Sequence, residues 1–158
     1  FVVKLTESKW MVSYATPTIA LKGAKREYDD PGMAEILRLL LPADVVVLEK
    51  AQPMPGQGVT SMFSVGLGFG LWRGIIAALG LPVLIVHPRT WQNVMLRDIP
   101  GDGTKGRSIV AAKRLFPSVD LRATERSKKP HDGKADALLM ALYGQGVLAG
   151  KESVDGKA

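Results

Sequence analysis

The sequence contains no cysteine and only two histidines, His87 and His131. The absence of cysteine excludes disulfide bonds, thiolate catalysis and zinc sites with cysteine ligands. Two histidines are also too few for a histidine-rich metal site. A metal in this protein therefore has to be bound by oxygen ligands, which suit Mg²⁺ and also Mn²⁺.

Long uninterrupted apolar runs are lacking as well. The most apolar stretch, residues 67–86, is broken by Arg73, several glycines and Pro82, so we predict a soluble protein with no membrane span. The first five residues read as a strand, and any targeting segment is expected to be absent or removed. With 158 residues, of which 46% are hydrophobic, the chain is long enough for one domain with a buried core.

Positive charge is in excess. Twenty-one lysines and arginines face fifteen acidic residues, which gives a formal net charge of +6. Residues 101–158 carry eleven basic and seven acidic side chains, whereas residues 1–100 carry ten and eight. A basic C-terminal third is the balance expected of a protein that binds phosphate, and nucleic acid in particular.

Periodicity predicts an α/β fold. An antiparallel hairpin is predicted from residues 1–5 and 10–14, joined by Thr6–Lys9. Buried parallel strands are predicted from the apolar runs 45–48 and 82–86. Together they predict a mixed sheet, antiparallel strands first and parallel strands after, with helices on both faces. The folded domain is expected to cover residues 1–146, with a flexible polar tail at 147–158. We expect helices at residues 30–41, 61–79, 90–96, 107–116 and 131–143. Asp29-Asp30-Pro31 supplies an N-cap and an early proline for the first of them, and the apolar segment 61–79 is expected to be buried.

Three carboxylates are candidates for metal binding. Glu49 ends the apolar run 45–48, at the kind of strand end where ligands bind in open α/β sheets. Asp132 and Asp136 are four residues apart, so on a helix they share one face and repel each other unless a cation lies between them. Taken separately, Glu49 is also explained as a solvated carboxylate beside Lys50, and the aspartates as a helix cap and a surface charge.

Taken together, these residues favour oxygen-ligated metal catalysis of phosphodiester cleavage. His131, which precedes the aspartate pair, is a candidate for proton transfer to the leaving oxygen, or alternatively a simple hydrogen-bonding side chain. No small-molecule cofactor is expected. The glycines at 66, 68, 70 and 74 do not match a dinucleotide-binding loop, because they follow a Pro/Gly loop instead of a strand. We interpret Gly70 and Gly74, which share one helix face, as the place where another helix packs closely, either within the chain or across a dimer interface.

Several segments occur in the order in which a known family has them. They are Val45-Val-Val-Leu-Glu-Lys50, the Pro/Gly/Gln loop that follows, Gly66-Leu-Gly-Phe-Gly-Leu-Trp-Arg-Gly74, His87-Pro-Arg-Thr-Trp91, Thr104-Lys-Gly-Arg-Ser108, Leu115-Phe-Pro117 and His131-Asp-Gly-Lys-Ala-Asp-Ala-Leu-Leu139. In this combination the chain resembles the RuvC-type Holliday junction resolvases over about residues 1–146. The chloroplast nucleoid branch and its bacterial and phage relatives look most similar.

The resemblance implies an RNase H-like fold and a homodimer that nicks four-way DNA junctions in pairs with Mg²⁺. It implies a chloroplast nucleoid or stromal location, or alternatively a bacterial or phage-infected cytoplasm. Glu49, Asp132 and Asp136 would be the metal ligands. The dimer interface would include Phe69, Gly70, Trp72 and Gly74. The predicted DNA-binding side chains are Lys50, Gln57, Thr60, Ser61, Phe63, Lys105, Arg107, Arg126, Lys128, Lys129 and Lys134.

The chain departs from the family at its start. The family's first catalytic aspartate lies on an opening strand, in an Asp-Pro motif, whereas Phe1–Leu5 matches the second strand. Asp29-Asp30-Pro31 does not replace that motif, because it opens a helix. We therefore expect further residues ahead of Phe1 in the complete protein. Trp91 is followed by Gln92, where a lysine is expected in many relatives, and one phosphate contact is weakened.

Two other functions remain compatible with the sequence. One is a junction-binding protein that does not cut, which the missing aspartate favours. The other is a different RNase H-like nuclease that acts on RNA or on transposon ends.

Overall fold

The computed structural model describes residues 1–158 except 6–10, 25, 53, 102 and 152–158. The chain divides into two compact units. The first unit joins Phe1–Ala15 to Val86–Ala158, and the second is Thr16–Ile85. The connection between the two predicted N-terminal strands, Thr6–Lys9, lies outside the described residues, and so does most of the predicted tail.

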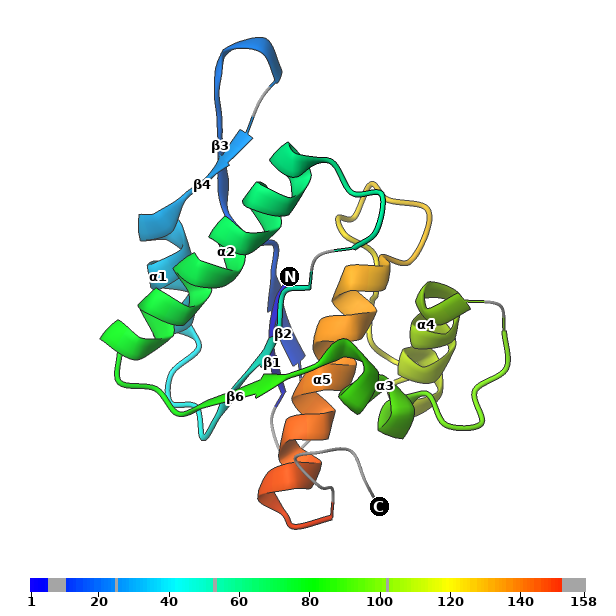
Figure 1. The fold of residues 1–158 in the computed structure, drawn as a ribbon. Coiled ribbons are helices and arrows are strands. Elements are labelled where there is room, and N and C mark those ends of the chain that lie inside the picture. Colours follow the sequence, from blue (N-terminus) through cyan, green and yellow to red (C-terminus); the bar gives the residue numbers. More distant parts are fainter. Residues whose placement is uncertain (6–10, 25, 53, 102, 152–158) are drawn as a thin grey trace. The chain divides into compact units, whose positions relative to one another are not determined.

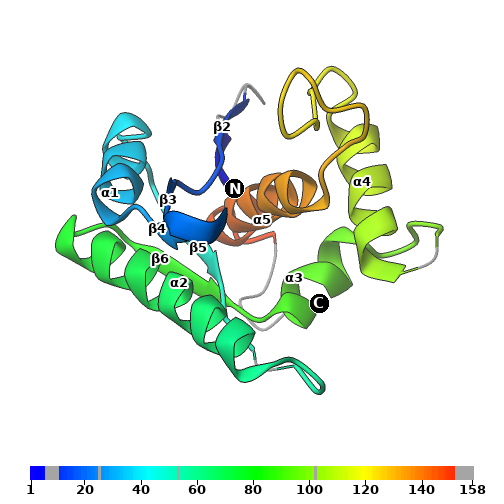
Figure 2. The ribbon, with the colours of Figure 1, turned by 90° about the horizontal axis from the view of Figure 1, so that it is seen from above.

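The first unit is built around its last helix. Strands β1 (Val2–Leu5) and β2 (Met11–Tyr14) pair antiparallel, with Val2 opposite Tyr14 and Leu5 opposite Met11. Helix α5 (Asp132–Leu148) packs against β1, α4 (Gly103–Leu115) and α3 (Pro88–Met95), as Figures 1 and 2 show. Its buried residues include Ala135, Leu138, Leu139 and Tyr143, each 0% exposed. The apolar sequence after Asp136 therefore forms the centre of this unit's core.

The second unit combines two short sheets with two helices. Strands β3 (Thr18–Ala20) and β4 (Arg26–Tyr28) pair antiparallel, and a short 3₁₀ turn, η1 (Lys22–Ala24), lies between them. Helix α1 (Asp30–Leu39) packs against α2 (Val59–Ala78) (Figure 1). Strands β5 (Val46–Glu49) and β6 (Val83–Val86) form the third sheet. The Val46 amide donates to the Pro82 carbonyl, as expected when two parallel strands start at the same end.

Local sequence signals explain where α1 begins. The side chain of Asp29 accepts a hydrogen bond of 3.0 Å from the Gly32 amide, and Pro31 occupies the first turn. The predicted cap at Asp29-Asp30-Pro31 is therefore confirmed. The apolar face of α1 buries Met33, Ile36 and Leu37, which recur at helical spacing.

The mixed α/β class is confirmed, and several details differ. The described residues form three separate two-stranded sheets instead of one mixed sheet. Strands β3 and β4 were not predicted, because each has three residues that are mostly exposed and show no apolar alternation. Helix α4 begins at Gly103 instead of Arg107, and α5 continues to Leu148 instead of Tyr143. The helix thus includes the first two residues of the predicted tail.

The prediction that residues 61–79 form a buried helix is wrong in one respect. The helix is present, yet only Gly68 and Ile76 are buried in it. Val59 and Phe63 are 78% and 71% exposed, and Leu67 is 45% exposed. The predicted burial of β6 fails similarly, since Val83 is 44% exposed. An apolar run indicates that a surface is to be covered, but not whether the same chain covers it.

Helix α2 is also long and apolar enough, by length and composition, to cross a membrane. The prediction that no such run exists is therefore wrong by this criterion. Its single charged residue is Arg73, and the glycines that were expected to interrupt it are nearly neutral in hydropathy. The same length and composition suit a helix that packs on a partner protein, so the feature alone is weak evidence for a membrane span.

Candidate metal and nucleic-acid site

Asp132 and Asp136 lie in the first two turns of α5, one turn apart. His131 precedes the helix as its N-cap, with extended backbone angles and no capping hydrogen bond from its side chain. Asp132 is therefore a first-turn carboxylate, which the partial positive charge at the helix N-terminus favours. The predicted helical spacing of the two aspartates is confirmed.

Asp132 is paired with a lysine from α4. Its Oδ2 lies 3.2 Å from Lys105 Nζ, and the side chains of the lysine and the aspartate are 83% and 32% exposed. The hydrogen bond from Lys105 lowers the pKa of Asp132, and burial opposes this to a smaller extent. Asp132 is therefore ionised at neutral pH, and its negative charge is partly balanced by Lys105.

Asp136 has a different environment. Its Oδ1 is buried and has no hydrogen-bond partner. Burial raises the pKa of Asp136, and repulsion from Asp132 adds to the increase, whereas the hydroxyl of Ser108 lowers it. A buried carboxylate oxygen without a donor is costly, and a cation or a proton is what would satisfy it. The two aspartates thus offer anionic oxygens at one helix face, the donor set that Mg²⁺ prefers.

Ser108 is the residue of this site that sequence reasoning did not select. It lies on α4 one turn after Lys105, and it is buried, with 1% exposure. Its hydroxyl donates to the Thr104 carbonyl at 3.0 Å. A hydrogen bond with the same side chain lowers the pKa of Asp136. The available signal was the spacing of Lys105 and Ser108, which places both on one face of a helix.

We expect Asp136 to destabilise the metal-free protein. Because its folded-state pKa is raised, the penalty is absent below the ordinary pKa of about 4 and complete once pH exceeds the raised value. Asp136→Asn should therefore raise the melting temperature at pH 7 by about 2–4 °C, and the difference should vanish near pH 3. Thermal unfolding in EDTA at both pH values measures this. A variant that melts below wild type at pH 7 would contradict the assignment.

His131 is placed beside the pair. Its Nδ1 lies 3.6 Å from Asp132 Oδ1, and its ring centroid is 4.8 Å from that of Phe1. The His131 amide donates to the Leu121 carbonyl at 2.8 Å. These contacts orient the imidazole next to Asp132, and its role in proton transfer stays a prediction.

Glu49 and Lys50 belong to the other unit. Glu49 is the last residue of β5 and is exposed, as expected for a strand-end carboxylate, and Lys50 is exposed beside it. Among the described residues, no three His, Asp or Glu side chains form a group that could hold a metal ion by themselves. The meeting of Glu49 with the aspartates of α5 therefore stays a prediction.

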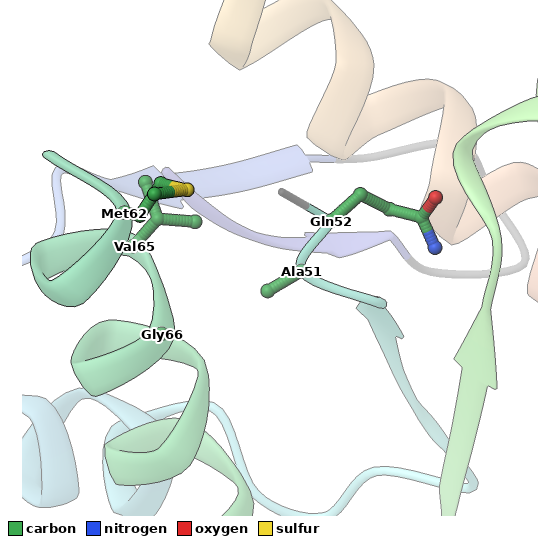
Figure 3. Close-up of a pocket in the computed structure, with 5 residues that line it drawn as sticks. All are labelled: Ala51, Gln52, Met62, Val65 and Gly66. Atoms are coloured by element: carbon green, nitrogen blue, oxygen red, sulfur yellow. The ribbon is translucent and has the colours of Figure 1, made fainter. Parts of the chain in front are cut away.

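The predicted DNA-contacting loop precedes α2. The Gln57 side chain donates from Nε2 to Ser61 Oγ at 2.9 Å and accepts from the Met54 amide at 3.4 Å, so it links the loop to the helix. Thr60 and Phe63 are exposed. A small pocket beside this loop is lined by Ala51, Gln52, Met62, Val65 and Gly66 (Figure 3). Met62 and Val65 point from α2 toward the segment that carries Ala51 (Figure 3).

The predicted basic residues fall into two groups. Arg126, Lys128 and Lys129 are exposed on the loop before α5. Arg107 is instead engaged by the fold, because its guanidinium donates to the carbonyls of Leu96 and, at 3.0 Å, Ile99. It thereby ties the end of α3 to α4. Lys134 Nζ donates to the Arg122 carbonyl at 3.2 Å. Arg107 and Lys134 thus make hydrogen bonds within the chain, and their phosphate contacts stay predictions.

The glycines of α2 divide into a packed one and open ones. A Cβ at Gly68 would lie 2.5 Å from the Tyr28 hydroxyl, which itself donates to the Ser64 carbonyl at 3.3 Å. Close packing within the chain therefore occurs at Gly68, and not at Gly70 or Gly74 as the sequence indicated. Those two are exposed, and a Cβ at either would meet nothing within 4 Å. Of the other predicted interface residues, Phe69 and Trp72 are half-buried, and Arg73 lies over the Phe69 ring.

In comparisons with known proteins, no protein-family model and no curated protein matches this chain.

Proposed function

We propose that this chain is a magnesium-dependent endonuclease domain with an RNase H-like fold that resolves four-way DNA junctions as a homodimer. The observation that supports this most directly is the buried Asp136 Oδ1, which lacks a partner and lies one turn from a second carboxylate. The motif order that resembles the RuvC-type resolvases supports the choice of substrate. The basic composition of residues 101–158 fits a nucleic-acid ligand.

In this proposal Asp132 and Asp136 hold Mg²⁺ or Mn²⁺, with Glu49 as a further ligand. When bound, the ion would activate a water and would stabilise the oxygen that leaves the phosphodiester. Ser108 orients the Asp136 carboxyl, while Lys105 is released from Asp132 and contacts a phosphate. His131 is positioned to donate a proton to the leaving oxygen.

A synthetic four-way junction, incubated with the complete protein and Mg²⁺, tests the proposal. We expect symmetrical nicks in two opposed strands, and none in EDTA. Equal cleavage of a linear duplex would identify a less selective RNase H-like nuclease. No cleavage of any DNA, together with no binding, would overturn the proposal.

A second candidate is a junction-binding protein that does not cut. The ion pair between Lys105 and Asp132 favours it, because the lysine already compensates one of the two carboxylates without a metal. In that case the same junction is retarded in a gel but stays intact with Mg²⁺. In the non-cutting protein, Lys105→Ala would not raise the affinity for a metal ion. In the nuclease it would raise that affinity, because the substitution frees Asp132 for the ion.

We expect Lys128→Ala to weaken DNA binding and to flatten its salt dependence. The side chain is exposed, and among the described residues nothing pairs with it. Loss of one phosphate contact reduces the slope of log K against log salt by about 0.9. Lys113→Ala, on the last turn of α4, is the matched control and should change neither quantity. Titration of a labelled junction in EDTA at several salt concentrations measures both, and an unchanged slope for Lys128→Ala would argue against the contact.

A further inference from the structure

The segment Asp120–Pro130, hereafter the basic loop, is held together by one arginine. The carboxylate of Asp120 accepts from the Arg122 amide at 2.9 Å, from its Nε at 3.0 Å and from Nη2 at 2.7 Å. The other terminal nitrogen of Arg122 donates to the Glu125 carbonyl at 3.1 Å. A planar guanidinium thus joins two points of the loop with fixed geometry.

Further bonds connect the basic loop to α5. Arg122 and Pro130 form an antiparallel bridge that joins the two ends of the basic loop. The amide of His131, the N-cap residue of α5, donates to the Leu121 carbonyl at 2.8 Å. Lys134 Nζ reaches back to the Arg122 carbonyl at 3.2 Å. Leu121 is 4% exposed and anchors the loop in the core of its unit. The basic loop is therefore fixed at the end of α5 that carries Asp132.

The other basic residues of the basic loop are not among those that hold it in place. Arg126, Lys128 and Lys129 are exposed, and within the described part of the chain none of them has an ion-pair partner. Three cations lie within four residues of this ordered loop, where Glu125 is the neighbouring anion in the sequence, so the loop concentrates positive charge at a cost in repulsion. A polyanion that contacts all three would offset that cost.

We propose that Asp120 and Arg122 are positioning residues that hold the basic loop in the shape in which Arg126, Lys128 and Lys129 bind the phosphates of a DNA arm. This inference rests on the proposed function and adds a preformed docking element to it. A loop ordered before binding loses less conformational entropy when DNA arrives, which increases affinity without adding a contact. The low pKa of Asp120, about 2 because of its bonds with Arg122, keeps this carboxylate ionised throughout the physiological range.

The proposal predicts that neutralising Asp120 changes DNA affinity in the direction opposite to the one expected from the loss of a negative charge. A carboxylate near a DNA site repels phosphate, so its neutralisation would ordinarily strengthen binding. If Asp120 instead shapes the loop, Asp120→Asn weakens binding. Glu125→Gln is the matched control, because it removes the same charge from the same loop while Arg122 bonds only to the Glu125 main chain.

The experiment measures binding of the full chain to a labelled four-way junction in EDTA over a range of salt concentrations. We expect about three- to tenfold weaker binding for Asp120→Asn and for Arg122→Gln. Glu125→Gln should bind as tightly as wild type or tighter. The salt slope of Arg122→Gln should equal that of wild type, since a positioning residue neutralises no phosphate, whereas a contacting arginine would reduce the slope by about 0.9.

Hydrogen exchange of the DNA-free protein gives a second readout. Amides of residues 122–129 should exchange faster in Asp120→Asn than in wild type, and at the wild-type rate in Glu125→Gln. Equal strengthening of binding by Asp120→Asn and Glu125→Gln would overturn the inference while the proposed function stands. A wild-type protein that binds vesicles of anionic phospholipid but no DNA would overturn both.

Discussion

Asp136→Asn is expected to abolish magnesium-dependent cleavage of a four-way junction while junction binding stays within about twofold of wild type. The substitution keeps the shape of the side chain and removes the negative charge of a metal ligand. Changes to residues that merely support a metal ligand cost about 10- to 100-fold in metal affinity or activity, so loss of the ligand itself should cost at least that much. Single-turnover cleavage with saturating protein measures the rate without a contribution from binding.

Metal binding itself separates this effect from a general defect. Mn²⁺ should bind wild-type protein and fail to bind Asp136→Asn at the same concentrations. Asp98→Asn is the matched control, since Asp98 is an exposed carboxylate of the same unit, and asparagine tolerates its positive φ of 57°. Cleavage by Asp136→Asn at the wild-type rate would refute the metal role of α5.

The local part of this site follows from sequence. Asp132 and Asp136 at helical spacing, followed by an apolar run, predict a helix whose first turns carry both carboxylates, and α5 has that form. Their unequal pKa values do not follow from spacing. The hydrogen bond from Lys105 on α4 lowers the pKa of Asp132, whereas burial raises the pKa of Asp136, and both effects arise from tertiary packing. A pattern within one helix cannot indicate which residues of another helix lie opposite it.

The same limit explains what was missed in α2. The run from Val59 to Ala78 predicts a helix, and its hydrophobicity predicts that something covers it. Sequence periodicity does not indicate whether the apolar surface of α2 is covered by the same chain, by a second copy or by a membrane. Tyr28 packs on Gly68 from a strand of three residues, too short to be recognised by alternation. Gly70 and Gly74, where an added Cβ would meet nothing within 4 Å, are the positions at which we propose that a second copy packs.

Gly70→Arg is expected to convert the proposed homodimer into a monomer. Gly70 is exposed on α2, on the same side as Gly74, and a side chain there has open space in the single chain. Replacement of an exposed helical glycine also favours the helix by about 0.5–1 kcal/mol, so the monomer should fold as well as before. In an apolar interface, by contrast, an unpaired arginine is strongly unfavourable.

We therefore expect the dimer dissociation constant to rise on the order of a hundredfold or more. Sedimentation should report a species near 17.0 kDa for the variant and near twice that mass for wild type. Gly70→Ala, which keeps the position small, is the control and should stay dimeric. Because paired nicking needs two active sites, Gly70→Arg should leave single nicks or no cleavage in a junction. A wild-type chain that sediments as a monomer, or is soluble only in detergent, would instead assign the exposed face of α2 to another partner or to a membrane.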